Sequence, residues 1–138
     1  MAYAGDVTAQ QAWEGLSSDS RSELVDVRTP AEWSFVGAPD LASLGKALVR
    51  VPWQVYPGMA LNPRFSEELA GAGVSKDHAL FFLCRSGTRS RAAAEAMTAL
   101  GYRRCYNVAD GFEGPRDSGA HRGRLAGWKA SGLPWTQE

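Results

Sequence analysis

Residues 79–102 read ALFFLCRSGTRSRAAAEAMTALGY, and the architecture can be worked out from this stretch. Residues 79–83 form an uninterrupted apolar run, the pattern of a strand that is buried on both faces. Cys84 ends the run, and an alanine-rich segment follows a few residues later. That segment carries apolar residues at helical spacing, namely Ala93, Met97 and Leu100. Gly101 stands where a left-handed helix cap is expected, so the stretch predicts a strand, a loop and a helix.

The loop after Cys84 has the composition of an anion-binding site. It consists of small or cationic residues, namely Arg85, Ser86, Gly87, Thr88, Arg89 and Ser90. Successive backbone N–H groups that lead into a helix N-terminus bind anions, and the two arginines add positive charge. A cysteine in these surroundings is favoured as the thiolate, which is the nucleophilic form. We therefore expect chemistry at Cys84.

The rest of the chain alternates strands with helices. Further strands are expected at residues 23–27, 48–53 and 104–108. Helices are expected at residues 9–17 and 30–33, from residue 62 to 71 or 73, and at residues 124–131. Residues 36–46 and 112–123 have loop compositions. This order predicts an α/β fold with a mainly parallel central sheet and helices on both faces. Ligands of such folds bind beyond the carboxyl ends of the strands, where Cys84 is expected to lie.

Size and composition exclude several classes of protein. With 138 residues, of which 44% are hydrophobic, the chain is expected to form one domain, residues 1–138. Fifteen basic residues balance fifteen acidic ones, so nucleic acid is not an expected partner. The apolar runs are too short to cross a membrane. Cys84 and Cys105 fit neither a disulfide framework nor a zinc motif, and no secretion signal is visible, so we expect a cytoplasmic protein without a metal or organic cofactor.

Other polar residues favour structural roles. Asp26 and Arg28 stand at the end of a predicted strand, where such pairs often tie loops together. Glu32 follows Thr29 at the spacing of a capping box, which indicates a helix cap rather than a catalyst. Cys105 lies in an alternating strand and is expected to pack in the core. The two histidines lack the context of a catalytic triad, so no general base is assigned.

One alternative chemistry for Cys84 is phosphate-ester hydrolysis. Protein tyrosine phosphatases place five residues between their cysteine and arginine, whereas four residues separate Cys84 from Arg89. The shorter loop makes a smaller cradle, which suits a sulfur atom better than a tetrahedral phosphate. Phosphatase activity therefore stays as a minor alternative hypothesis.

Three segments of the chain resemble motifs of the single-domain rhodanese family of sulfurtransferases. They are LVDVRTPAEW at residues 24–33, CRSGTRS at residues 84–90 and GWKASGLPW at residues 127–135. Two loops depart from the family pattern. Residues 35–46 lack the histidine of the family's Gly-His-Ile-Pro-Gly-Ala segment, and residues 115–124 are longer than the usual connection. Both departures bear on substrate and partner choice rather than on the fold.

The resemblance implies a rhodanese-like fold and a two-step sulfur transfer. Cys84 would take a sulfane sulfur from a small anionic donor such as thiosulfate and hold it as a persulfide. Arg85, Ser86, Gly87, Thr88, Arg89 and Ser90 would bind the substrate, and cyanide or a thiol would accept the sulfur. Two other functions remain open, a persulfide relay that serves a protein acceptor and a regulatory module with the same fold.

Overall fold

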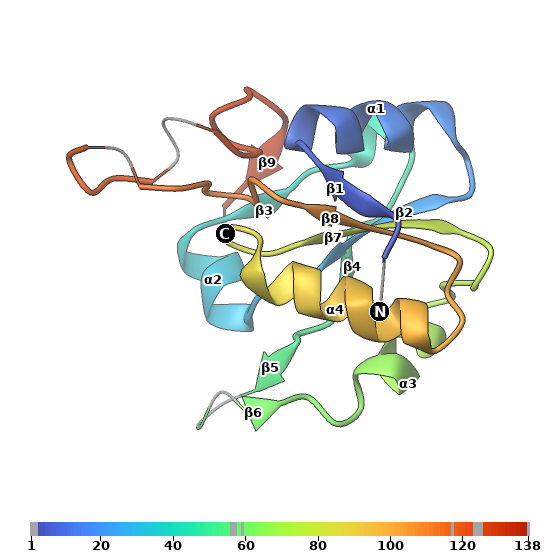
Figure 1. The fold of residues 1–138 in the computed structure, drawn as a ribbon. Coiled ribbons are helices and arrows are strands. Elements are labelled where there is room, and N and C mark those ends of the chain that lie inside the picture. The colour runs from blue at the N-terminus through green and yellow to red at the C-terminus, as the bar shows by residue number, and fades with distance from the viewer. Residues whose placement is uncertain (1–2, 56–57, 59, 117, 123–125, 138) are drawn as a thin grey trace.

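A five-stranded parallel sheet forms the centre of the computed structural model, which describes residues 3–55, 58, 60–116, 118–122 and 126–137. The strand order is β1-β8-β7-β2-β4, and every neighbouring pair is parallel. The strands are β1 (Gly5–Val7), β2 (Ser22–Asp26), β4 (Val49–Arg50), β7 (Ala79–Leu83) and β8 (Arg104–Val108). Figure 1 shows them with the flanking helices. The parallel sheet predicted from the sequence is confirmed.

Strand β7 lies in the middle of the sheet, as its continuous apolar run predicts. All five of its residues are buried, and it pairs with β2 on one side and β8 on the other. Leu80 and Phe82 belong to one hydrophobic cluster, and Phe81 and Leu83 to the other, because successive side chains of a strand point to opposite faces.

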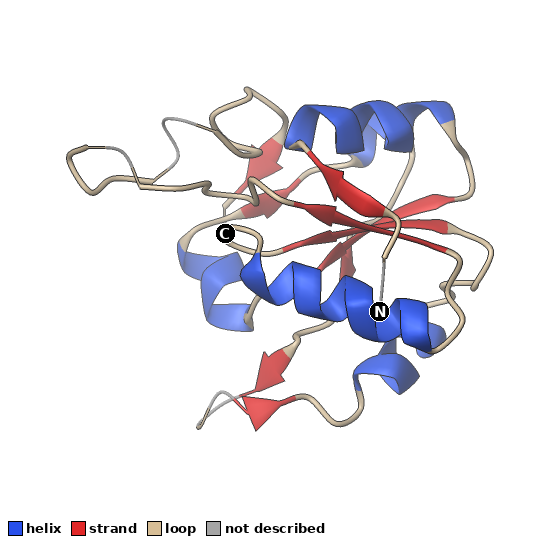
Figure 2. Cartoon of the chain, viewed as in Figure 1, coloured by secondary structure: helices blue, strands red, loops and turns tan. Residues whose placement is uncertain are grey.

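Helices cover both faces of the sheet (Figure 2). Helix α1 (Ala9–Ser18) packs on one face, and helices α3 (Phe65–Gly71) and α4 (Thr88–Ala99) pack on the other. The shorter α2 (Pro30–Phe35) follows β2. Both capping boxes are present, with Thr8 and Gln11 at α1 and with Thr29 and Glu32 at α2. The expected arrangement of helices is confirmed.

Two helices differ from the sequence prediction at their starts. Helix α3 begins at Phe65 rather than near residue 62, because the Asn62 side chain accepts a hydrogen bond from the Arg64 N–H and holds a turn there. Helix α4 begins at Thr88, inside the stretch predicted as loop. Gly87 caps it with φ 107°, a conformation that glycine adopts readily.

The connections contain short elements that the sequence did not reveal. Strand β3 (Ala38–Pro39) pairs with β9 (Trp135–Thr136), β5 (Gln54–Val55) pairs with β6 (Ala60–Leu61), and residues 42–44 form a 3₁₀ turn, η1 (Ala42–Leu44). The segment 36–46 is therefore not a plain loop. The expected strand at 48–53 shortens to Val49–Arg50, ending before Pro52, which has no N–H to donate to a ladder.

The helix predicted at residues 124–131 is wrong for its described part. Residues 124 and 125 lie outside the described residues, and residues 126–131 form turns. The cause is Gly127, which has φ 107° and approaches the backbone of Gly111 and Gly114 so closely that an added Cβ would lie 3.0 Å from each. The Trp128 N–H then donates to the Gly111 carbonyl at 2.9 Å, which binds this segment to the turn after β8.

Candidate active site

The Cys84 sulfur lies inside the turn between β7 and α4, with the residue only 1% exposed. The Gly87 N–H donates to Sγ at 3.2 Å and the Ser90 N–H at 3.4 Å. The Ser90 hydroxyl oxygen is 3.2 Å from the same sulfur. Both N–H groups belong to the start of α4, where the helix dipole favours negative charge. The arrangement can therefore stabilise a thiolate or a persulfide.

Ser90 connects the sulfur to a chain of polar groups that crosses β8 and β1. Its hydroxyl donates to Asn107 Oδ1 at 2.6 Å, and Asn107 Nδ2 donates to Asp6 Oδ1 at 3.0 Å. The Tyr3 hydroxyl also donates to Asp6, at 2.6 Å, and this hydrogen bond holds the pKa of Asp6 below its ordinary value. A carboxylate only accepts, so the Asn107 NH₂ group must face Asp6 and its carbonyl must face Ser90. The Ser90 proton is thereby directed away from the sulfur.

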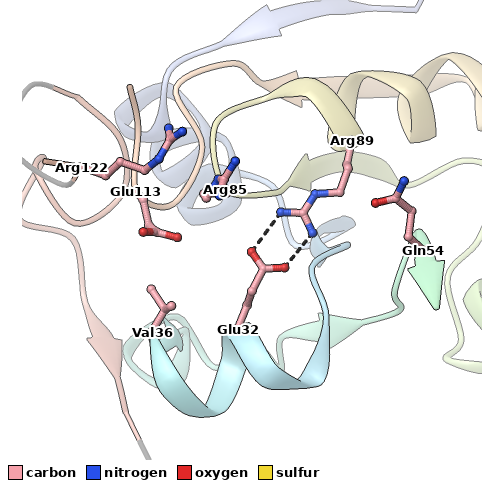
Figure 3. A pocket seen from close by; sticks show the side chains of 7 residues that line it. All are labelled: Glu32, Val36, Gln54, Arg85, Arg89, Glu113 and Arg122. Carbon is pink, nitrogen blue, oxygen red and sulfur yellow. Dashed lines mark hydrogen bonds and ion pairs between the residues drawn. The ribbon is translucent and has the colours of Figure 1, made fainter. Parts of the chain in front are cut away.

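Arg89 forms a bidentate ion pair with Glu32 of α2 (Figure 3). Its Nη1 and Nη2 atoms donate to the two carboxylate oxygens at 2.7 and 2.9 Å. Burial opposes ionisation of Glu32, but the hydrogen bonds and charge of Arg89 outweigh it and hold the pKa of Glu32 below its ordinary value. The hydrogen bond to Glu32 likewise raises the pKa of Arg89. Glu32 is thus a cap, as expected, and also the partner of a predicted site residue.

A cavity of about 500 Å³ opens beside the loop that follows Cys84. Seven side chains line it, namely Glu32, Val36, Gln54, Arg85, Arg89, Glu113 and Arg122. In Figure 3, Glu113 and Arg122 lie on one side of Arg85 and the Glu32–Arg89 pair lies on the other. Cys84 is not among the lining residues, because the loop covers its sulfur. The cavity therefore lies beside the loop and not on the sulfur itself, and we call it the vestibule.

The six predicted loop residues divide into three pairs. Gly87 and Ser90 contact the sulfur, and Arg85 and Arg89 line the cavity. Ser86 and Thr88 do neither in the described part of the chain: Ser86 is half-buried and Thr88 exposed. The structure thus brings four of the six to places where they can act on a substrate or on the sulfur.

The turn after β8 holds the loop in place through its backbone. The Phe112 N–H donates to the Cys84 carbonyl at 2.8 Å, and the Glu113 N–H donates to the Arg85 carbonyl at 3.0 Å. A Cβ on Gly87 would collide with the Ala109 carbonyl oxygen, so the two segments pack backbone against backbone. Glycine is required at residue 87 for this contact as well as for its φ angle.

Asp26 and Arg28 form a fully buried ion pair at the end of β2, with 2.7 Å between Oδ2 and Nη2. Nη2 of Arg28 also donates to the Gly37 carbonyl at 2.8 Å, and its guanidinium lies 4.3 Å from the centre of the Phe112 ring. The pair joins β2 to the segment after α2 and to the turn after β8. This is the structural role that the sequence indicated.

Cys105 is remote from Cys84. It pairs in register with Leu80 across β7 and β8, four residues before Cys84, which corresponds to about 13 Å along a strand. That distance exceeds what a disulfide can bridge. Burial raises the pKa of the Cys105 thiol, which makes it less reactive. Cys105 is a packing residue, as expected from the sequence.

No group of three or more His, Cys, Asp or Glu side chains in the described ranges is arranged to hold a metal ion. The helices in the same part of the chain are too short or too polar to cross a membrane.

Comparison with known proteins gives the family. The family model described as the STR4 middle domain matches residues 4–138. The chain belongs to this family. Among its relatives is protein RC0915 of Rickettsia conorii, which is 40% identical over 131 residues, covering 94% of this chain and 95% of that protein. The chloroplastic rhodanese-like domain-containing protein 4 of Arabidopsis thaliana is 31% identical over 96% of this chain, which spans only 26% of that larger protein.

Solved structures place this STR4 middle domain among the rhodanese-like folds. Rv0390 of M. tuberculosis aligns with a TM-score of 0.89 and 49% identity, covering 99% of this chain and 100% of its own. The polysulfide-sulfur transferase homodimer of Wolinella succinogenes aligns with a TM-score of 0.63 at 18% identity, over 96% of this chain and 78% of that one, which supports the fold alone. The expected rhodanese-like fold is confirmed.

Several residues around the site carry no local sequence signal of their role. Asn107 looked like an ordinary polar residue of an alternating strand, and no local pattern connects it to Ser90. Glu113 and Arg122 lie in the stretch 112–123, which was read as an exposed loop. The unusual length of the adjoining segment was the available signal that this region had a role.

Proposed function

We propose that the protein is a sulfurtransferase in which Cys84 carries the transferred sulfur. The thiolate attacks the outer sulfur of a donor such as thiosulfate, the S–S bond of the donor breaks, and sulfite leaves with the electron pair. An acceptor, cyanide or a thiolate, then attacks the outer sulfur of the persulfide. The bond to Cys84 breaks and the thiolate is regenerated. We also propose a cytoplasmic location, because a reducing compartment keeps the Cys84 thiol free.

One observation carries this proposal, the set of contacts on the Cys84 sulfur. The Gly87 and Ser90 N–H groups, both at the start of α4, donate to Sγ at 3.2 and 3.4 Å. Such donors stabilise the thiolate that attacks and the anionic persulfide that results. Arg85, at the cavity wall, supplies positive charge for an anionic donor.

The state of Arg89 argues against the phosphatase alternative. A phosphatase needs an arginine that is free to bind a phosphoryl group with both guanidinium NH₂ groups. In this protein Nη1 and Nη2 of Arg89 already bind Glu32 at 2.7 and 2.9 Å. We therefore assign Arg89 the role of holding the loop against α2 and neutralising the charge of Glu32.

The test is a steady-state analysis with thiosulfate and cyanide. A persulfide intermediate predicts ping-pong kinetics, seen as parallel lines in double-reciprocal plots, and complete loss of turnover in Cys84→Ser. Cys105→Ser is the matched control and should turn over as the wild type does. Intersecting lines, or residual turnover in Cys84→Ser, would contradict the mechanism. Loading by thiosulfate without turnover to cyanide would favour the relay that serves a protein acceptor.

A further inference from the structure

The cavity beside the loop is larger than the proposed small substrates require. Its volume is about 500 Å³. A thiosulfate or cyanide ion displaces only a few water molecules, each of which occupies about 30 Å³ in the liquid. Most of the cavity therefore stays open beside such an ion, and Glu113 and Arg122 line it on one side of Arg85 (Figure 3).

Glu113 and Arg122 are connected to the loop after Cys84 by hydrogen bonds to backbone carbonyls. The Arg85 carbonyl accepts from the Glu113 N–H at 3.0 Å and from the Gly114 N–H at 3.1 Å. The Gly114 carbonyl in turn accepts from Nη1 of Arg122 at 2.8 Å. A continuous set of contacts thus runs from the residue next to Cys84 to the guanidinium of Arg122. Both side chains belong to a defined wall of the cavity.

The charges on that wall are only partly balanced. Arg89 and Glu32 neutralise each other as a bidentate pair. Arg85, Arg122 and Glu113 make no ion pair with any other residue in the described ranges, although they line one cavity. The charge of Glu113 also acts on Lys129, which does not line the cavity, so two cations and one anion of the lining remain without an ion pair and can bind a ligand. The complementary ligand carries two negative groups and one positive group.

We infer that this wall is a binding subsite for a zwitterionic amino-acid thiol, which accepts the sulfur held by Cys84. Arg122 binds its carboxylate, Glu113 binds its ammonium group, and Arg85 attracts its thiolate towards the loop. The thiolate attacks the outer sulfur of the Cys84 persulfide, a new S–S bond forms on the amino acid, and the Cys84 thiolate leaves with the electron pair. This inference rests on the proposed function, because it names the acceptor of the same persulfide.

The first test measures how fast the persulfide form transfers its sulfur to four matched thiols at equal thiolate concentration. L-cysteine carries both charged groups, 3-mercaptopropionate lacks the ammonium, cysteamine lacks the carboxylate and 2-mercaptoethanol lacks both. We expect L-cysteine to react fastest in the wild type, with each missing group costing roughly two- to fivefold, as for partly solvated charge contacts. Rates that agree within error for the four thiols would overturn the inference.

Variants of Glu113 and Arg122 test which residue binds the ammonium group and which binds the carboxylate of the thiol. Glu113→Gln should abolish the advantage of L-cysteine over 3-mercaptopropionate and leave its advantage over cysteamine. Arg122→Gln should do the reverse. Arg116→Gln and Glu14→Gln are the controls, because both residues are exposed and neither lines the cavity. A uniform loss for all four thiols in either cavity variant would show a structural effect and contradict the subsite.

A second measurement separates this inference from the proposed function. S-methyl-L-cysteine cannot accept sulfur, so its binding, followed by NMR titration of the unmodified protein, does not depend on the persulfide. Binding that weakens in both Glu113→Gln and Arg122→Gln supports the subsite even if thiosulfate fails to load Cys84, an outcome that would refute only the proposed donor reaction. Absence of binding together with normal loading would refute the subsite and leave the proposed function intact.

Discussion

At the scale of single residues, the site depends on which partner each polar atom takes. Arg89 was expected to meet the substrate, yet both of its NH₂ groups bind Glu32. Ser90 offers the sulfur its N–H, while its hydroxyl proton goes to Asn107. The loop thus supplies the N–H donors to the Cys84 sulfur, whereas Glu32 and Asn107, outside the loop, bind the Arg89 guanidinium and the Ser90 hydroxyl.

Replacing one or the other member of the Glu32–Arg89 pair should change the thiosulfate kinetics in opposite directions. Arg89→Ala leaves a half-buried carboxylate facing the cavity, so we expect thiosulfate kcat/KM to fall by about tenfold or more, the equivalent of roughly 1.5–3 kcal/mol. Glu32→Gln releases the guanidinium to bind anions, so the KM for thiosulfate should decrease. If Glu32→Gln instead lowers kcat/KM for thiosulfate as much as Arg89→Ala does, the pair only holds the shape of the cavity.

The same pair should make stability depend on pH. The pKa of Glu32 lies below its ordinary value of 4.5 in the folded protein, so its ionised form stabilises the fold above that pH. The contribution is lost as the pH falls through the lowered pKa. Urea unfolding should therefore show the wild type more stable than Glu32→Gln at neutral pH, with the difference vanishing in acid. A difference that persists unchanged into acid would show that ionisation of Glu32 is not its source.

At the scale of elements, the site is formed where three segments meet, the β7–α4 turn, the N-terminus of α2 and the turn after β8. Each of the three is recognisable locally: the apolar run of β7, the capping box of Thr29 and Glu32, and the Asp110-Gly111 turn. Their mutual contacts are not local. Glu32 and Arg89 are 57 residues apart, and Asp6 and Asn107 are 101 apart. Periodicity and capping rules act over a few residues, so the sequence predicted the cradle but not its partners.

Close backbone packing at Gly87 should make this residue intolerant of substitution. Gly87→Ala places a Cβ against the Ala109 carbonyl and forces alanine to φ 107°, so we expect a loss of unfolding free energy of about 1–3 kcal/mol or more. Gly71→Ala is the matched control, because an added Cβ there meets nothing within 4 Å. Urea unfolding of the two variants measures the difference. Equal stabilities would mean that the turn after β8 can move away from the loop.

The hydrogen-bonded chain Ser90–Asn107–Asp6 should slow the alkylation of Cys84, because it keeps the Ser90 hydroxyl proton away from the sulfur. Asn107→Ala removes the acceptor of the Ser90 hydroxyl proton, which is then free to donate to the Cys84 sulfur. We expect iodoacetamide to alkylate Cys84 faster in this variant at pH 7, because the extra donor stabilises the thiolate. Ser90→Ala, which lacks the hydroxyl, should abolish the gain when combined with Asn107→Ala. An unchanged or slower rate in Asn107→Ala alone would contradict this assignment.

At the scale of the whole molecule, a parallel sheet places Cys84 at the carboxyl edge of its central strand. This position and the helix that follows were predictable, since both depend on the hydrophobic pattern of residues 79–102. The turn at residues 126–131 was not predictable, because its conformation depends on the close approach of Gly127 to Gly111 and Gly114 in the turn after β8. The vestibule likewise combines side chains from α2, β5 and the segment after β8.

The most direct test of the central claim, that Cys84 carries the transferred sulfur, is the intact mass of the protein after incubation with thiosulfate and desalting. The wild type and Cys105→Ser should each gain the mass of one sulfur atom and lose it again when cyanide is added. Cys84→Ser should gain nothing. An unchanged mass in the wild type, or the same gain in Cys84→Ser, would contradict the account.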